Sequence, residues 1–324
     1  MRVERILLIL SLGLLLILMS LSNQSKCPSP LAEAGQRTAV PSDPTATAMA
    51  TPVVPTASPG QTTTSRLRTL VEAMKGAGTD KGPYGHRYYR YYRRWFAEFQ
   101  QQPGLKLLEI GAQQGGSLLA WSRFFTDPEL IMGLAYGDMT EGVEGRAKNM
   151  SKVTVHFGDQ GKNETMQYLR EAGPWDVIID DGSHYPPHMI FGFFHLWTSV
   201  RAGGMYVIED LETNYWRNGS RMYGYTMLGE GFFNGPNFSA VSKLQQFQHV
   251  LVRHQIGARE LSIMDGDHDI CSLEWGMNIV AIKKCSEDEK ANNPPYRNNT
   301  AKGFYKPEIL TKWIRQAKST NPYV

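Results

Sequence analysis

The sequence predicts an α/β fold with a mostly parallel sheet, and three observations lead to this prediction. From Arg66 onward, short apolar stretches typical of strands alternate with helix-like stretches. A glycine-rich turn follows the first of these strands and begins a helix. Hydrophobic residues make up 41% of the 324 residues, and 31 glycines come in addition, so the chain can bury a sizeable core.

Seven strands and seven helices are expected in chain order. The strands are Leu105–Ile110, Ile131–Tyr136, Val153–Phe157, Trp175–Asp180, Met205–Ile208, and a final pair near Ser272–Trp275 and Asn278–Lys283. The helices are Arg66–Lys75, Tyr88–Gln100, Ser117–Phe125, Glu164–Glu171, His188–Val200, Ser239–Arg253 and, in the polar tail, Pro307–Ala317. We find no internal repeat.

The N-terminus differs from the rest of the chain. Arg2 and Arg5 precede an apolar run of about 16 residues, Ile6–Leu21, shorter than the roughly 20 of a full membrane span. We expect a signal anchor or signal peptide over 1–21, followed by a Pro/Thr/Ser-rich stalk over 22–66. A folded domain is expected at 67–285 and a polar tail at 286–324.

This layout favours the secretory pathway. The leading prediction is a type II Golgi membrane protein with a lumenal domain. A secreted or plastid protein is the alternative. Six glycosylation sequons agree with a secretory route; they begin at Asn23, Asn149, Asn163, Asn218, Asn237 and Asn298. The anchor, if uncleaved, would make the membrane a partner.

Charge and cysteine content exclude several classes of protein. The formal net charge of +3 argues against a dedicated nucleic-acid-binding protein, and three cysteines without C-x-x-C spacing argue against a zinc site. With a hairpin turn at Trp275–Met277, Cys285 falls opposite a residue near 267, so the spacing does not predict a bond to Cys271. Cys27 lies in the stalk, where it could link two chains; oligomerisation is left open.

The stretch HRYYRYYRRWFAEF is predicted to be an amphipathic helix. Tyr88, Tyr92, Trp95 and Phe99 share one face, and the arginines lie on another. We interpret the basic face as a solvated surface, with a phosphate- or nucleic-acid-binding role as the alternative.

Two motifs carry the chemistry. In LLEIGAQQGGSLLAW, Gly111, Gly115 and Gly116 allow a tight turn close to a ligand, and Ser117 can cap the following helix.

The second motif places Asp180, Asp181 and His184 after one strand and Glu209 and Asp210 after the next. Loops at the carboxyl ends of adjacent strands face one crevice, so these groups should converge there. Uncompensated, such carboxylates repel, and a magnesium or manganese ion would relieve the repulsion.

Four pieces of the chain resemble the class I S-adenosylmethionine-dependent methyltransferases of the macrolide-sugar type. They are GTDKG at Gly78–Gly82 with His86 and Tyr88–Tyr92, LLEIGAQQGGS, DDGSH, and GGMYVIEDLETNYW. The resemblance implies a single Rossmann-like, doubly wound domain with a mostly parallel seven-stranded sheet and one antiparallel strand. It also implies an O-methyltransferase that uses S-adenosylmethionine and Mg²⁺ and acts on a sugar hydroxyl of a glycan or glycoconjugate.

The resemblance also assigns roles to individual residues. Asp181, Glu209 and Asp210 would hold magnesium, and His184 would be the general base that accepts the hydroxyl proton. The expected cofactor-binding residues are Glu109, Gly111, Gly115, Gly116, Ser117, Asp138, Asp159 and Asp180. One position departs from the pattern: Ala135 stands where such enzymes carry a ribose-binding acid, and Asp138 is the expected substitute.

Three alternatives stay open at this stage. The acceptor could be another hydroxyl-bearing small molecule, aromatic or lipid. A lumenal glycosyltransferase would share the anchor, the stalk and a metal site with paired Asp, but it leaves the Glu109–Ser117 turn unexplained. A methyltransferase-like binding module without turnover would agree with Ala135.

Overall fold

The computed structural model describes residues 67–137, 142–227, 239–255, 261–292 and 312. Within these ranges a seven-stranded sheet has the order β3-β2-β1-β4-β5-β9-β8. The strands are β1 (Leu105–Ile110), β2 (Pro128–Ala135), β3 (Val153–Phe157), β4 (Trp175–Asp180), β5 (Val200–Ile208), β8 (Ile270–Gly276) and β9 (Ile279–Lys284). All pairings from β3 through β5 are parallel, whereas β9 is antiparallel to both β5 and β8. The predicted sheet with one antiparallel strand is confirmed.

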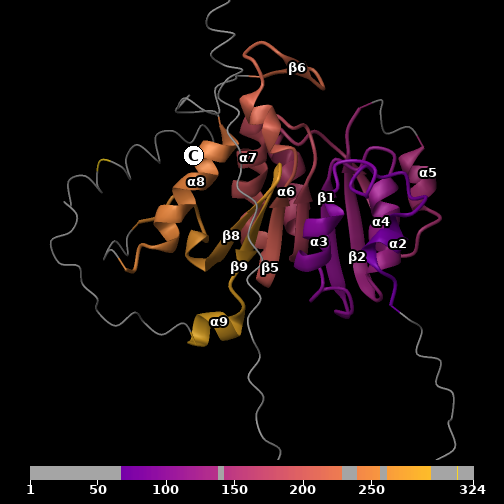
Figure 1. The fold of residues 1–324 in the computed structure, drawn as a ribbon, viewed down its shortest axis with the longest axis horizontal. Coiled ribbons are helices and arrows are strands. Elements are labelled where there is room, and N and C mark those ends of the chain that lie inside the picture. Colours follow the sequence, from indigo (N-terminus) through magenta and orange to yellow (C-terminus); the bar gives the residue numbers. More distant parts are fainter. Residues whose placement is uncertain (1–66, 138–141, 228–238, 256–260, 293–311, 313–324) are drawn as a thin grey trace, which may run out of the picture. The chain divides into compact units, whose positions relative to one another are not determined.

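The helices form a layer on each face of the sheet (Figure 1). The helices of these layers are α2 (Leu70–Met74), α3 (Tyr89–Trp95), α4 (Gly116–Phe124), α5 (Val143–Ala147), α6 (Asn163–Ala172), α7 (Pro186–Leu196) and α8 (Ala240–Leu251); α9 (Glu287–Asn292) follows β9. Residues of α2, α3, α4 and α5 pack into one hydrophobic core, and residues of α6, α7 and α8 pack into the other.

The central strands supply side chains to both cores, because successive side chains of a strand point to opposite faces. In β1, Leu107 belongs to the core under α4, and Leu108 belongs to the core under α7. All six residues of β4 are buried. This two-sided burial explains why the central strands read as continuous apolar runs in the sequence.

The strand predictions were more accurate than the helix predictions. The ranges of β1, β3 and β4 match residue for residue, whereas α3 ends at Trp95, five residues before the predicted end. Among the α-helices and strands of the described residues, the sequence prediction missed α5, α9 and a small hairpin of β6 (Arg221–Met222) and β7 (Tyr225–Thr226). Tyr223 and Gly224 form the turn of this hairpin, both with positive φ (46° and 88°), as a two-residue β-turn of this kind requires.

The β8–β9 hairpin corrects the prediction for the cysteines. Met277 and Asn278 form its turn, because Gly276 pairs with Ile279, and Asn278 has a φ of 65°. The register also shifts between Ile270 and Ser272. Both features differ from the register assumed from the sequence, and together they bring Cys271 and Cys285 into a disulfide with a Cα–Cα distance of 4.9 Å.

Several sequence predictions fall outside the described residues. These are the anchor and stalk at 1–66, Asp138, and the Pro307–Ala317 helix except for Lys312. Among the helices within the described ranges, none has the length and apolar character needed to cross a membrane.

Candidate active site

The sheet places the two motifs side by side. Strand order reverses between β1 and β4, and such a switch point is where open α/β sheets bind ligands. Ile110 pairs with Asp180 at the carboxyl ends of these strands, and Asp181 N donates to Ile110 O at 2.9 Å. The glycine-rich turn and the DDGSH loop are therefore neighbours, as predicted.

Close backbone contacts explain the glycines of the turn. A Cβ on Gly111 would lie 1.9 Å from Asp181 O, and a Cβ on Gly116 would lie 2.2 Å from Gly78 O. Gly115 has a φ of 77° and is the N-cap of α4. These glycines thus allow the turn to touch two other loops, one from β4 and one from the GTDKG segment.

Ser117 does not cap α4, and this part of the prediction is wrong. Gly115 is the cap and makes no side-chain cap hydrogen bond. The Ser117 hydroxyl instead donates to Glu109 Oε2 at 2.6 Å, and Trp121 Nε1 donates to the same oxygen at 3.2 Å. Glu109 is fully buried; burial raises its pKa to about 7, against the lowering effects of Lys81 and Ser117. The cofactor-binding roles of Glu109 and Ser117 stay predictions.

Lys81 is buried among the acidic side chains. Its Nζ contacts Asp181 Oδ2, donates to Glu209 Oε2 at 2.9 Å and lies 3.7 Å from Glu109 Oε1. Burial lowers the pKa of Lys81, but the three carboxylates raise it more, so the pKa lies well above its usual value and Lys81 is a cation. The acidic cluster therefore has a counter-charge from the protein itself, which the sequence prediction did not include.

Asp181, His184 and Asp210 form a group that could hold a metal ion. One ligand atom from each lies within 4.8 Å of the other two. Two carboxylates and an imidazole fit a divalent cation, and the hard oxygens favour magnesium or manganese. Glu209, the third predicted ligand, is not in this group; Tyr92 donates to its Oε1 and Lys81 donates to its Oε2. Its role as a ligand stays a prediction.

His184 has an unusual backbone conformation and a free ring nitrogen. Its φ is 54°, and Asp210, next to it in space, has a φ of 53°. Such conformations in residues other than glycine concentrate at functional sites. His184 Nε2 lies 3.4 Å from Asp210 Oδ2, and buried Nδ1 has no hydrogen-bond partner among the described residues. This arrangement leaves Nδ1 available to accept a proton, as a general base requires.

Two tyrosines from the aromatic helix segment reach this cluster. Tyr88 OH donates to Asp210 Oδ1 at 2.5 Å, and Tyr92 OH donates to Glu209 Oε1. Tyr88, Tyr92, Trp95 and Phe99 are all buried, so the predicted apolar face is confirmed. The sequence interpretation missed that two of its hydroxyls orient acidic side chains.

Asp180 faces away from this cluster. Its carboxylate accepts hydrogen bonds from Gln160 Nε2 at 2.8 and 3.0 Å and from Tyr206 OH at 3.2 Å. Burial raises its pKa to about 7. The prediction that Asp180 joins the other carboxylates in one pocket is wrong, because Asp180 and Asp181 are successive residues at the strand end and point apart. Through Gln160, Asp180 instead supports the Ser183 backbone, whose N–H donates to Gln160 Oε1 at 2.9 Å.

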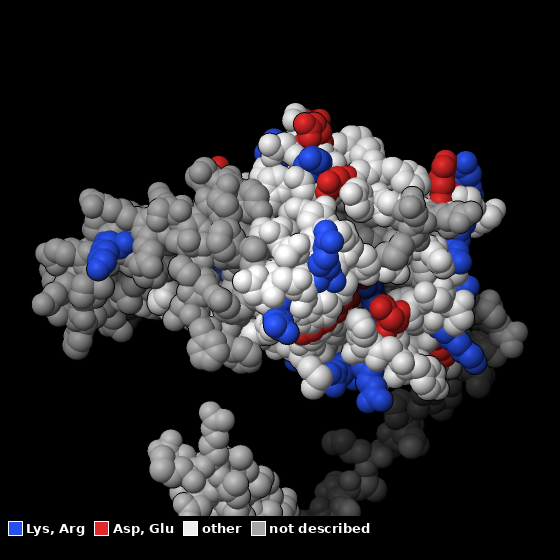
Figure 2. All heavy atoms as spheres, turned by 90° about the horizontal axis from the view of Figure 1, so that it is seen from above, with Lys and Arg blue, Asp and Glu red and all other residues white. Residues whose placement is uncertain are grey.

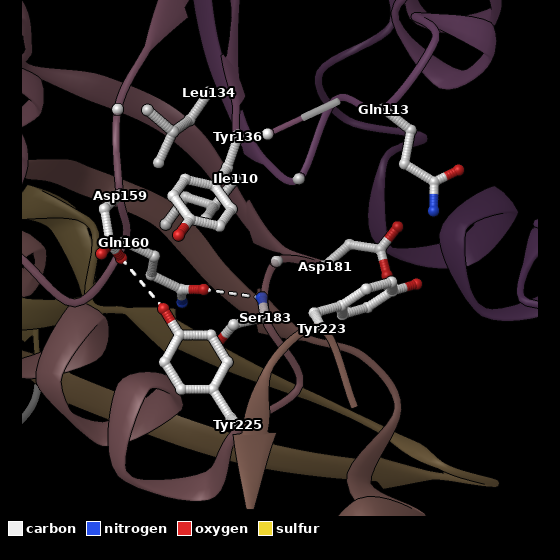
Figure 3. A pocket seen from close by; sticks show the side chains of 14 residues that line it. Ile110, Gln113, Leu134, Tyr136, Asp159, Gln160, Asp181, Ser183, Tyr223 and Tyr225 are labelled. Atoms are coloured by element: carbon white, nitrogen blue, oxygen red, sulfur yellow. Dashed lines mark hydrogen bonds between the residues drawn. The ribbon is translucent and has the colours of Figure 1, made fainter. Parts of the chain in front are cut away.

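An apolar cavity of about 270 Å³ lies on one side of the DDGSH loop. Figure 3 shows Tyr136 and Ile110 on one wall, with Asp159 and Tyr225 joined by a hydrogen bond on another. Tyr225 OH donates to Asp159 Oδ1 at 3.2 Å, and the Tyr225 ring stacks on the Tyr185 ring with 5.3 Å between the ring centroids. The small β6–β7 hairpin is thereby attached to the cavity wall.

The structure at the end of β2 bears on Ala135, which stands where an acidic ribose-binding residue was expected. Ala135 is fully buried, whereas the next two residues, Tyr136 and Gly137, line the apolar cavity. Asp138 lies outside the described residues, so its proposed ribose contact stays a prediction. Asp159 lines the cavity, in agreement with the expected place near the adenine, but its contact with a cofactor also stays a prediction.

A second, acidic cavity of about 380 Å³ adjoins the first. Its lining includes Asp80, Lys81, His86, Asp181, His184, Asp210 and Glu212. Gly111, Gln113, Asp181 and Tyr223 line both cavities. Viewed from above, the described surface has acidic atoms at the bottom of a narrow recess (Figure 2). The two cavities can therefore place two ligands in contact with each other.

A seven-stranded sheet with one antiparallel strand, a glycine-rich turn after β1 and a cavity at the switch point define the fold of S-adenosylmethionine-dependent methyltransferases. The MycE methyltransferase of the mycinamycin biosynthetic pathway, solved with Mg, SAH and mycinamycin VI, has this fold. It matches with a TM-score of 0.56 and 29% sequence identity, over 69% of this chain and 57% of that chain. No protein-family model matches the sequence.

Two relatives indicate which kind of methyltransferase the chain is similar to. The mycinamicin VI 2''-O-methyltransferase of Micromonospora griseorubida is 36% identical over 160 residues, 47% of this chain and 38% of the relative. The demethylmacrocin O-methyltransferase of Streptomyces fradiae is 38% identical over 139 residues, 40% of this chain and 33% of the relative. Less than half of the chain is thus similar to macrolide-sugar O-methyltransferases, and the predicted resemblance is confirmed. The matches span 33% to 38% of the length of these two relatives.

Proposed function

We propose that the protein is an S-adenosylmethionine-dependent, magnesium-dependent O-methyltransferase that acts on a sugar hydroxyl of a glycan or glycoconjugate. The observation that carries this proposal is the pair of adjoining cavities with Asp181 and Tyr223 in both walls. One cavity is lined by apolar and aromatic side chains, and the other presents carboxylates and an imidazole. A cofactor in the first and a hydroxyl in the second would meet at the shared wall.

The apolar cavity suits the adenosine part of the cofactor. Ile110, Leu134 and Tyr136 offer apolar surface for the base, and Asp159 and Gln160 offer polar groups for its edge and the ribose. The cofactor's methionine end would then lie near Gly111 and Gln113, which border both cavities. SAH-bound MycE supports this placement by fold similarity.

The acidic cavity suits a hydroxyl-bearing acceptor. Asp181 and Asp210 would hold the cation, with Glu209 as the predicted third ligand, and the cation would lower the pKa of a bound hydroxyl. Asp210 beside Nε2 favours the ring proton on that nitrogen and keeps Nδ1 of His184 ready for the hydroxyl proton. The walls that the two cavities share would position the acceptor oxygen near the methyl group, and such positioning would supply much of the rate because the cofactor is already activated.

A transfer assay tests the function. The full-length protein is incubated with methyl-labelled S-adenosylmethionine, Mg²⁺ and glycans that carry neighbouring hydroxyls, and products are examined by mass spectrometry. We expect a methylated glycan and loss of transfer with EDTA. If calorimetry shows no S-adenosylmethionine binding, the proposal is wrong. If the protein instead methylates aromatic or lipid acceptors, and glycans do not compete with them, the acceptor is an aromatic or lipid compound and not a glycan.

We also propose that the protein works in an oxidising compartment of the secretory pathway, as a type II Golgi membrane protein. The Cys271–Cys285 disulfide supports this location, since disulfides persist mainly in such compartments. Asn149, Asn163 and Asn218, which begin sequons, are exposed. The test is treatment of the expressed protein with an N-glycosidase, together with protease protection of membranes. An unchanged mass and a protease-accessible domain in intact vesicles would contradict this location.

A further inference from the structure

The GTDKG segment holds Lys81 in a fixed place. Lys81 is 1% exposed, its N–H donates to Thr79 Oγ1 at 3.3 Å, and its carbonyl accepts from Tyr89 N at 2.9 Å. The carbonyl of Gly78, at the start of the segment, lies so close to Gly116 that a Cβ there would be 2.2 Å away. The position of the ammonium group is therefore built into the fold.

This ammonium occupies oxygens that a divalent cation would need. Asp181 belongs to the candidate metal group, and its Oδ2 contacts Lys81 Nζ. Glu209, which the sequence predicts as a ligand, has Oε2 bonded to Lys81 and Oε1 bonded to Tyr92. A cation that binds Asp181 or Glu209 thus meets the charge of Lys81 at the same atoms.

We propose that Lys81 is an internal competitor of the divalent cation. Its single charge holds Asp181 and Glu209 together and lowers the affinity of the site for Mg²⁺, so a doubly charged ion displaces it only when abundant. Lys81 is a positioning residue in this role, since it acts through the carboxylates. The inference rests on the metal requirement in the proposed function and deepens it.

Calorimetric titration of the full-length protein with MgCl₂ alone tests the inference. Lys81→Met and Lys81→Gln remove the charge, and Gln keeps a donor for the carboxylates. We expect both variants to bind Mg²⁺ about tenfold or more tightly, because a unit charge close to a divalent site changes its affinity at least that much. Lys75→Met removes an exposed lysine of the same region and should bind Mg²⁺ as the wild type does.

Equal or weaker Mg²⁺ binding by both Lys81 variants would overturn the inference. Thermal unfolding without metal identifies a variant that fails to fold; a merely structural lysine would lower stability without raising metal affinity. If neither variant folds, acetylation of Lys81 in the wild-type protein, followed by mass spectrometry, replaces the titration. Saturating Mg²⁺ should speed up acetylation of Lys81, and an unchanged rate would overturn the inference.

The outcomes separate this inference from the proposed function. Tighter Mg²⁺ binding by the variants, without methyl transfer by the wild type, would support the role of Lys81 and reject the function. Methyl transfer by the wild type, with unchanged or weaker Mg²⁺ binding by both variants, would support the function and reject the role of Lys81.

Discussion

The apolar cavity and the acidic cavity adjoin each other but are built in different ways. Ile110, Tyr136 and Asp159 of the apolar cavity lie at or just beyond the ends of successive parallel strands. The acidic cavity instead combines distant segments, since Lys81 contacts Asp181 one hundred positions away and Tyr92 contacts Glu209 across 117 positions. The first cavity is thus a property of the fold, and the second is a property of particular side chains carried by it.

The largest effect expected from this difference concerns Asp210. Asp210→Asn removes a carboxylate that lines only the acidic cavity, contacts His184 and belongs to the candidate metal group. We expect kcat/KM for methyl transfer to fall about a thousandfold or more, which is typical for loss of a charge that activates a nucleophile. Mg²⁺ affinity should fall as well, whereas calorimetry without Mg²⁺ should show nearly unchanged affinity for S-adenosylhomocysteine. Loss of both affinities would show that the two cavities are not separable.

His184→Ala should have the next largest effect. General bases contribute roughly a hundredfold to ten-thousandfold to rate, and we expect kcat to fall within that range. Cofactor affinity should stay unchanged, because His184 lines only the acidic cavity. His188→Asn, which changes a histidine near Tyr225 on the apolar side, is the comparison variant and should keep most of its kcat. Full activity of His184→Ala would reject His184 as the base.

The buried carboxyl group of Asp180, which is hydrogen-bonded to Gln160 of the apolar cavity, should make the stability of the protein depend on pH. Burial raises its folded-state pKa to about 7, whereas in the unfolded chain it is about 3.9. The folded protein therefore keeps a proton that the unfolded chain releases between about pH 4 and 7, and the stabilisation from this group is lost as pH rises through that window. The loss is on the order of 3 kcal/mol.

Asp180→Asn cannot ionise, so its free energy of unfolding should fall less between pH 4.5 and 7.5, as measured by urea denaturation. The exposed Asp127→Asn should keep the wild-type pH dependence. If Asp180→Asn and the wild type lose the same stability over this window, the carboxyl group of Asp180 is ionised in the folded protein at low pH.

The smallest effect concerns the hairpin. Tyr225→Phe removes the hydroxyl that donates to Asp159 Oδ1 at 3.2 Å and keeps the ring that stacks on Tyr185. Loss of one such hydrogen bond costs about 1 kcal/mol, so we expect roughly fivefold weaker binding of S-adenosylhomocysteine. Mg²⁺ affinity, measured without cofactor, should not change. An equal loss of Mg²⁺ affinity would show that the hairpin supports both cavities.

The sequence was most informative where local pattern determines structure. The strand β1 and the turn at Gly111–Gly116 follow from apolar runs and glycines that are close in the chain. The direction of Asp180 could also have been deduced, since adjacent residues of a strand point to opposite faces. The cysteine register could not, because it depends on the turn at Met277–Asn278 and on the irregularity between Ile270 and Ser272.

Other parts of the site depend on packing between distant segments. The motif GTDKG contains Lys81, but the chain pattern does not show that a lysine side chain enters an acidic core. Tyr88 and Tyr92 fit a packing face by spacing alone, and their hydroxyl partners, Asp210 and Glu209, lie more than a hundred residues away. Such contacts require the three-dimensional arrangement.

The close contact between Gly111 and Asp181 has a consequence for ligand binding. The two backbones touch so tightly that a Cβ on Gly111 would lie 1.9 Å from Asp181 O, and both residues line both cavities. A shift of either backbone on binding in one cavity must therefore move the wall of the other. Cofactor and cation should then be thermodynamically linked, and each must change the affinity of the other by the same factor.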